Sequence, residues 1–180
     1  TESKLPDFWE RATQGAYTNH GRPHIEMVEH YVGELLGKER LNKLYPEEFF
    51  ILVLGVFCHD LGMMRFRSEG KDKIKIERDL HNVWSYQFIY ENGTPTELAK
   101  KNIIVPENKY YKPIALLCLG HRDHNDEKGD TVHTLKDTCE INGKKVKIEE
   151  KITIGSIDVH LRYLAAILRL ADELDLDNTR

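Results

Sequence analysis

The chain has 180 residues, 40% of them apolar, and this length favours one compact domain with a sizeable core over two domains. Its 26 basic and 30 acidic residues give a net charge of −4, which excludes an overall basic surface for duplex nucleic acid. The longest apolar run, residues 49–58, is too short to span a membrane, which takes about 20 apolar residues. We therefore expect a soluble protein without a membrane partner.

Three cysteines, Cys58, Cys118 and Cys139, form no CxxC pair, and an odd number without that spacing is typical of a reducing compartment. The first residues carry no apolar segment of the kind found in secretory signals, so we expect a cytoplasmic protein. The missing initiator methionine and the abrupt end at Arg180 suggest processing or the N-terminal part of a longer chain. A C-terminal domain or a homo-oligomer is therefore an expected partner.

Helices are predicted where apolar residues recur at helical spacing between proline and glycine residues. The first begins after Arg22 and ends at Gly37. The second begins at Pro46, is apolar on all sides over residues 49–58, as a central buried helix should be, and ends before Gly62. The remaining helices are expected over residues 80–90, 111–119 and 157–176, and a shorter one near residues 96 and 97.

Residues 131–155 interrupt this helical pattern with alternating polar and β-branched residues. Within them, Asn142-Gly143 is a strong hairpin signal because both residues adopt positive φ readily. The predicted fold class is mainly α, with a small β-hairpin insertion of two or three strands before the last core helix. Residues 1–180 are expected to form one domain.

Polar side chains occupy positions where four of these helices should be apolar. His24 starts the apolar stripe of the first helix, and His59 and Asp60 follow the apolar second helix. His121 extends the apolar face of the fourth helix, and Asp172 lies within the stripe of the last. Burying such groups is unfavourable without a partner, and imidazole and carboxylate groups together are ligands that divalent metal ions prefer.

Readings without a metal stay open at this point. His24 alone fits an amphipathic histidine at a helix start, and Asp172 fits a salt bridge to Arg162 or Arg169. The common HExxH, CxxC, GxxxxGK[ST] and GxSxG patterns are missing, which argues against zinc-protease, zinc-finger, P-loop and serine-hydrolase sites. The acids of the last helix expected to be solvated are Glu173 and Asp175.

In this order the residues resemble the HD superfamily of metal-dependent phosphohydrolases. Its signature is a histidine on one helix, an adjacent His-Asp pair and a distant aspartate on a late helix. Here the signature is read as His24 in HIEMVEHYV, His59-Asp60 in FCHDLG and Asp172 in ILRLADELD. The resemblance covers roughly residues 22–175 and implies an HD-type helical domain with these four residues around one metal ion.

Many members of the superfamily carry two further histidines between the His-Asp pair and the last aspartate, and hold two metal ions. His81 and His121 occupy these places. The resemblance implies a second divalent ion on Asp60, His81 and His121, with His124 as the reserve ligand. The ions expected are Mn, Ni, Co, Fe, Zn or Mg, and Asp60, His81 and His121 are expected to be catalytic.

The activity implied by the resemblance is hydrolysis of a phosphate ester in a nucleotide or single-stranded nucleic acid through a metal-activated hydroxide. Arg22, Arg122 and His124 flank the ligands and are expected to bind the substrate, since guanidinium groups pair with phosphate oxygens. Other basic residues near the ligands in sequence are Arg65, Arg67, Lys71 and Arg78.

Two other classes of function remain as alternatives. The first is a non-catalytic regulatory module that binds a nucleotide and signals to the remainder of a larger protein. In support, LAAILRLADELDLDNTR after a β insertion looks like prokaryotic HD domains of larger proteins, some attached to a GHKL-type ATPase. The second is a structural metal site, which would need only four closed ligands, fewer than the candidates here.

Overall fold

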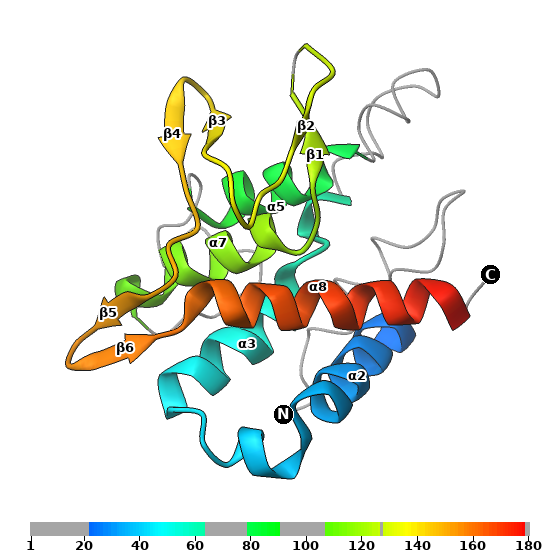
Figure 1. Cartoon of the computed structure of the whole chain (residues 1–180), viewed down its shortest axis with the longest axis vertical. Coiled ribbons are helices and arrows are strands. Elements are labelled where there is room, and N and C mark those ends of the chain that lie inside the picture. Colours follow the sequence, from blue (N-terminus) through cyan, green and yellow to red (C-terminus); the bar gives the residue numbers. More distant parts are fainter. Residues whose placement is uncertain (1–21, 64–78, 91–106, 127, 179–180) are drawn as a thin grey trace, which may run out of the picture.

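A computed structural model describes residues 22–63, 79–90, 107–126 and 128–178. Within these ranges the chain is mainly helical, with small antiparallel strand pairs between the last two helices (Figure 1). The expected short helix near residues 96 and 97 lies outside the described residues, as do Arg65, Arg67, Lys71 and Arg78. The helices are α2 (Arg22–Leu41), α3 (Pro46–Cys58), α5 (His81–Tyr90), α7 (Tyr111–Gly120) and α8 (Leu161–Asn178), and the 3-10 turn η3 (Asn108–Tyr110) precedes α7.

Helix α7 is the centre of the bundle. It packs against α3, α5 and α8, and all of its residues except Lys112 are buried. Residues 113–120 include no charged side chain, so every face of the helix can meet an apolar neighbour. The prediction that residues 49–58 form the helix buried on all sides is wrong, because Phe49 in α3 is 52% exposed.

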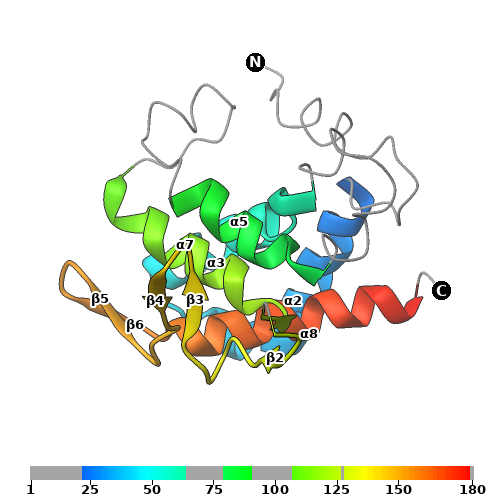
Figure 2. The same cartoon turned by 90° about the horizontal axis from the view of Figure 1, so that it is seen from above.

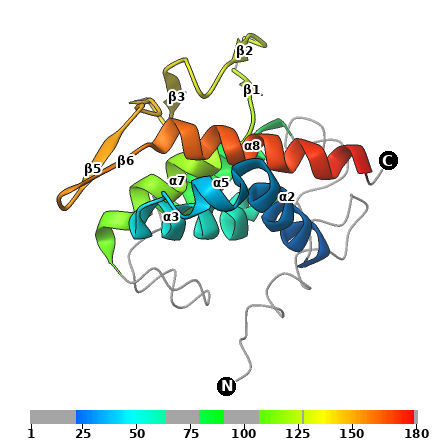
Figure 3. The ribbon, with the colours of Figure 1, turned by 60° about the horizontal axis from the view of Figure 1, so that its bottom comes forward.

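Helices α2 and α8 lie against each other and close one side of the bundle (Figure 3). Helix α2 contributes Ile25, Val28, Val32 and Leu36 to the core at spacings of three and four residues, as the sequence pattern predicts. Gly37 has a φ of 63° and a ψ of 164°, which breaks the helix there before a short helical segment continues to Leu41.

The start of α3 is joined to the start of α8 by a buried carboxylate. Glu48 accepts hydrogen bonds from the backbone N–H of Tyr45 at 3.1 Å and of His160 at 2.9 Å. It also accepts one from Nδ1 of His160 at 2.8 Å. Burial raises the pKa of Glu48, but these hydrogen bonds with His160 and Tyr45 outweigh it and leave the pKa below its usual value.

The insertion consists of three separate hairpins, the last of which projects beyond the helices in Figure 2. Asn142 and Gly143 form the turn of the middle hairpin, with φ values of 51° and 71°. The prediction of one two- or three-stranded insertion is therefore corrected to three two-stranded pairs. They are β1 (His124–Asn125) with β2 (Thr131–Val132), β3 (Cys139–Ile141) with β4 (Lys144–Val146), and β5 (Ile152–Ile154) with β6 (Ile157–Val159).

The last helix begins four residues later than predicted. Residues 157–159 form β6, and α8 starts at Leu161, because Gly155 with a φ of 64° turns the chain into the β5–β6 hairpin. The periodic apolar pattern of residues 161–171 remains the core face of α8. None of the helices in the described ranges has both the length and the apolar character needed to cross a bilayer.

Candidate metal centre

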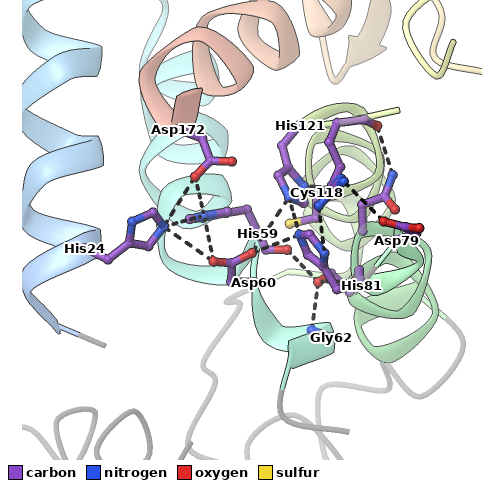
Figure 4. Close-up of polar contacts among 12 residues, drawn as sticks. His24, His59, Asp60, Gly62, Asp79, His81, Cys118, His121 and Asp172 are labelled. Atoms are coloured by element: carbon purple, nitrogen blue, oxygen red, sulfur yellow. Dashed lines mark hydrogen bonds and ion pairs between the residues drawn. The ribbon is translucent and has the colours of Figure 1, made fainter. Parts of the chain in front are cut away.

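Four side chains from three parts of the bundle meet in a first cluster (Figure 4). His24 comes from α2, His59 and Asp60 from the turn after α3, and Asp172 from α8. Nε2 of His24 lies 3.1 Å from Nε2 of His59 and 3.4 Å from both Oδ2 of Asp60 and Oδ1 of Asp172. Nε2 of His59 lies 3.3 Å and 3.6 Å from the same two oxygens. All four residues are buried.

A second cluster shares Asp60 with the first. Nε2 of His81, at the start of α5, lies 2.8 Å from Nε2 of His121, which follows α7. Oδ1 of Asp60 lies 3.2 Å from Nε2 of His81 and 3.8 Å from Nε2 of His121. Asp60 thus presents one carboxylate oxygen to each cluster.

The spacing of these atoms matches that of ligands around one ion. Metal bonds of about 2.1 Å place neighbouring ligand atoms about 3.0 Å apart in an octahedral shell and about 3.4 Å apart in a tetrahedral one. The contacts in the first cluster span 3.1 to 3.6 Å. The residues predicted from sequence as metal ligands are therefore brought together as two groups that could each hold an ion, His24, His59 and Asp60 in one and Asp60, His81 and His121 in the other. Asp172 adjoins the first group through its contacts with the two histidines.

The Nδ1 atoms of His59 and His121, which point away from the clusters, are held by backbone carbonyl groups. Nδ1 of His59 donates to the carbonyl oxygen of Val56 at 2.8 Å, and Nδ1 of His121 donates to that of Cys118 at 2.6 Å. Since Nδ1 carries the proton, Nε2 of each neutral ring presents a lone pair to the cluster. Lone pairs and carboxylate oxygens that face one another favour a bound cation, so the donor set fits a metal ion.

Asp175 completes the arrangement around His24. Its Oδ2 accepts a hydrogen bond from Nδ1 of His24 at 2.7 Å, and the side chain is buried. Sequence reasoning missed this residue and assigned it to solvent together with Glu173, which is exposed. The available signal is the spacing of three residues from Asp172, which places Asp175 on the same face of α8. Carboxylate, histidine and metal in a row is a common arrangement in metalloproteins.

The charges around the first cluster attract positive charge. Burial alone lowers the pKa of His24, but the hydrogen bond with Asp60 and its charge outweigh burial and raise it. Burial is likewise outweighed for His59, whose pKa is raised well above its usual value chiefly by the charge of Asp60. Burial would raise the pKa of Asp172, yet the hydrogen bond with His59 lowers it. Protons on the two histidines and a metal ion therefore compete for one site.

The second cluster has the opposite electrostatic character. Burial, followed by repulsion from His81 and His59, lowers the pKa of His121 to about 3. The ring is therefore neutral at pH 7, as metal coordination requires. Arg122 lies close by, with Nη1 3.5 Å from Nδ1 of His81. This cluster combines one shared carboxylate with a neighbouring cation, so it holds less negative charge than the first.

The alternative in which Asp172 pairs with an arginine is wrong among the described residues. Arg162 donates to the carbonyl oxygen of Ile148 at 3.1 and 3.3 Å. Arg169 donates to the carbonyl oxygen of Gly120 at 3.0 Å. The ion pairs of Asp172 in the described part of the chain are with histidines. The reading of His24 as an ordinary amphipathic histidine is also wrong, because its ring is buried within the first cluster.

The three residues predicted to bind substrate lie in different surroundings. Arg22 is exposed and pairs with Glu26 at 2.7 Å on the surface of α2. Arg122 is partly buried beside the second cluster, where its Nη2 lies 3.8 Å from Oδ1 of Asp79. His124 is buried in β1 and is not among the described ligand atoms that form the two clusters. Of the three, only Arg122 has a contact with a cluster residue in the described part of the chain.

A serine joins the His-Asp turn to α5. Oγ of Ser85 accepts a hydrogen bond from the backbone N–H of Gly62 at 2.8 Å and lies 2.5 Å from the carbonyl oxygen of His59. It also lies 2.9 Å from the carbonyl oxygen of His81. A Cβ at Gly62 would collide with that carbonyl group. The glycine of the HDLG segment therefore permits the close approach that brings His81 to Asp60.

The cysteines offer no further ligand or nucleophile. Cys58, Cys118 and Cys139 are free and buried. Burial raises the pKa of Cys58 to about 12 and that of Cys139 to about 11, and it raises the pKa of Cys118 as well. Thiols with such pKa values are protonated at neutral pH and are weak nucleophiles, and no cysteine belongs to the groups of described residues that could hold a metal ion.

The comparison with known families agrees with this geometry. The model of the HD-CE family matches residues 15–180, which include every residue of the two clusters. No curated protein and no solved structure was found to match the chain. Because the family model covers nearly the whole length, and because the clustered histidines and aspartates are typical of HD-type domains, the chain belongs to the HD-CE family.

Proposed function

We propose that the protein is a metal-dependent phosphohydrolase that acts on a phosphate ester of a nucleotide or of single-stranded nucleic acid. The observation that carries the proposal is the position of Asp60, whose two carboxylate oxygens face two separate groups of histidine Nε2 atoms. Two ions about 3.5 to 4 Å apart are a common arrangement in phosphatases and nucleases, and a shared carboxylate is suited to hold such a pair.

The residues of the two clusters would form two ion-binding sites that share Asp60. His24, His59, Asp60 and Asp172 would hold one ion, and Asp60, His81 and His121 the second. When bound, such ions lower the pKa of water and neutralise charge on a phosphoryl group. In their neutral forms, His24 and His59 present fixed Nε2 lone pairs because their Nδ1 atoms donate to Asp175 and to the carbonyl oxygen of Val56. This pre-organisation removes the need to reorient the rings when an ion binds.

Arg122 is the residue best placed to bind the phosphate group. Its guanidinium lies beside His81, with Nη1 3.5 Å from Nδ1 of that ring, Nη2 3.8 Å from Oδ1 of Asp79, and Nε 3.3 Å from the carbonyl oxygen of Asp123. A guanidinium group offers two parallel donors to phosphate oxygens. The position at the edge of the second cluster would orient the ester toward the histidines.

The test is phosphate release by the purified chain in the presence of Mn²⁺, Ni²⁺, Co²⁺ or Mg²⁺. Nucleotides and single-stranded oligonucleotides serve as substrates. Asp60→Asn keeps the shape but removes the charge that both clusters share, so we expect release to fall at least about 100-fold. Asp158→Asn on the exposed side of β6 is the matched control and should retain full activity.

Two outcomes would contradict the proposal. Activity that survives Asp60→Asn at the level of the control would show that the clusters are not the reaction site. A chain that binds divalent ions and nucleotides but releases no phosphate from any of these substrates would favour the regulatory module.

A further inference from the structure

The C-terminal end of α7 is held by side chains that come from other elements. The last carbonyl groups of a helix have no partner within the helix itself. Here the carbonyl oxygen of Leu119 accepts a hydrogen bond from Nδ2 of Asn82 at 3.0 Å, and that of Gly120 accepts one from Nε of Arg169 at 3.0 Å. His121 follows directly, so these bonds set where its ring can lie.

Arg169 links this helix end to the residues around the first hairpin. Its Nη2 donates to Oγ1 of Thr134 at 2.6 Å and pairs with Oδ1 of Asp123 at 2.9 Å. Thr134 is fully buried, donates from Oγ1 to the carbonyl oxygen of Arg122 at 2.9 Å, and donates from its backbone N–H to Asp123 at 3.0 Å. Asp123 is held in addition by Nδ1 of His133, which donates to its Oδ2 at 2.9 Å.

The network also connects the two clusters. Arg169 precedes Asp172 by three residues, so both lie on neighbouring turns of α8. Asp172 belongs to the first cluster, whereas Gly120 and Arg122 enclose His121 of the second. A shift of Arg169 relative to α7 would therefore change the position of His121 relative to Asp172.

We propose that Arg169, Thr134 and Asp123 are positioning residues that fix His121 relative to Asp172. The β1–β2 hairpin, which Asp123 and Thr134 flank, thereby supports the position of His121 in the second cluster. This inference rests on the proposed function, in which His121 binds the second ion. It assigns a role to residues outside the two groups that could hold an ion.

The energetic support for this role comes from charge-assisted hydrogen bonds. The contact of Arg169 with Asp123 is short and only partly exposed to solvent, and bonds to charged groups are stronger than neutral ones. A metal site tolerates displacements of about 0.5 Å in its ligands before affinity falls. Groups that orient the ligands of a metal typically change its affinity by about 10- to 100-fold when they are lost.

The experiment compares four variants of the full chain. Thr134→Val keeps the volume of the buried side chain but removes its hydroxyl group, and Thr134→Ser keeps the hydroxyl group. Arg169→Gln removes the link to α7. Arg162→Gln is the matched control, because Arg162 also lies on α8 and binds a backbone carbonyl group of the insertion, that of Ile148.

Binding of Mn²⁺ is followed by EPR, in which a spin-coupled pair reports that the second cluster is filled. We expect Thr134→Val and Arg169→Gln to raise the dissociation constant of the second ion about 10-fold and that of the first less than about 2-fold. In Thr134→Ser the dissociation constant of the second ion should lie within about 3-fold of the wild-type value, and in Arg162→Gln it should be unchanged. Equal weakening of the binding of both ions in all variants would point to a general loss of packing and would overturn the inference.

Hydrogen exchange of the metal-free chain separates this inference from the proposed function. We expect amide exchange over residues 119–124 to become faster in Thr134→Val and to stay unchanged in Arg162→Gln. If the wild type takes up no second ion, the two-ion function is wrong, and exchange alone then decides whether the network positions His121. Unchanged amide exchange over residues 119–124 in Thr134→Val would overturn the inference, and so would an unchanged affinity for the second ion. If Arg169→Gln does not fold, Thr134→Val still tests the inference.

Discussion

Replacing Asp175 with asparagine tests the chemistry of the first cluster through a residue that is not a proposed ligand. The Asp175 carboxylate lies 2.7 Å from Nδ1 of His24, and both side chains are buried. Asparagine can still accept the hydrogen bond through its amide oxygen. The substitution therefore removes the negative charge behind His24 while it keeps the shape of the contact.

The expected loss follows from the position of this charge. A carboxylate that accepts the outer N–H of a ligating histidine makes the ring a stronger ligand, and its removal weakens metal binding by about 10- to 100-fold. At a metal concentration about 100 times the wild-type dissociation constant, a bound ion stabilises the fold by about 2.7 kcal/mol. With affinity reduced 10- to 100-fold, the same concentration would contribute only about 1.4 to 0.4 kcal/mol.

Two measurements read out this effect. Calorimetric titration with Mn²⁺ gives the dissociation constant, and urea unfolding with and without the ion gives the stabilisation. Glu173→Gln is the matched control. Glu173 is exposed and lies two residues before Asp175 on the same helix, so this substitution removes a negative charge that does not contact the cluster. We expect the control to bind metal as the wild type does.

Equal affinities of Asp175→Asn and wild type, within about 2-fold, would refute the assignment of Asp175 as the partner of a metal-binding histidine. Equal losses in Asp175→Asn and Glu173→Gln would show that only the overall negative charge matters. A loss of stability without metal that exceeds the loss with metal would show that the contact is structural.

Three further predictions concern the surroundings of the site. Because the folded pKa of Glu48 is lowered, its contribution to stability is complete above the unfolded pKa near 4.5 and is lost as the pH falls through the folded pKa. Glu48→Gln should therefore cost about 2 kcal/mol in urea unfolding at pH 7, and this cost should shrink as the pH is lowered below 4.5. Gly62→Ala should push α5 away and destabilise the fold by about 1 to 3 kcal/mol, and it should lower metal stoichiometry, since the new methyl group meets the backbone of His81. Because the pKa values of His24 and His59 are raised, protons compete with the metal for these rings. Calorimetry should therefore show that metal affinity decreases as the pH falls through those pKa values. A metal affinity that does not change between pH 8 and pH 5 would contradict this prediction.

The spacing of residues in the sequence was sufficient to predict the helices of the described ranges and to single out His24, His59, Asp60, His121 and Asp172, because each of these depends on local periodicity. Apolar residues three and four apart define one face of a helix, and a histidine or aspartate on that face has to be buried. His24 and Asp172 were identified in this way before any contact was known. The family resemblance added His81 and His121, which the structure places beside Asp60.

The choice of partners was beyond the reach of the sequence. Asp172 had Arg169 one turn away on the same helix, yet the guanidinium binds the end of α7. Asp175 and Glu173 looked alike as acids near the end of the chain, and only the packing of α2 against α8 places Asp175 at Nδ1 of His24. Periodicity predicts the helix face on which a residue lies, but it does not predict which other element packs against that face.

The position of each helix in the bundle was decided in the same way by tertiary structure. Residues 49–58 and 113–120 are both apolar on all sides in sequence, and the prediction selected the first as the central helix. In the structure α7 is surrounded by α3, α5 and α8, whereas Phe49 of α3 lies exposed. Local hydrophobicity states how much surface a helix can bury, and only the arrangement of the other helices determines how much of it is covered.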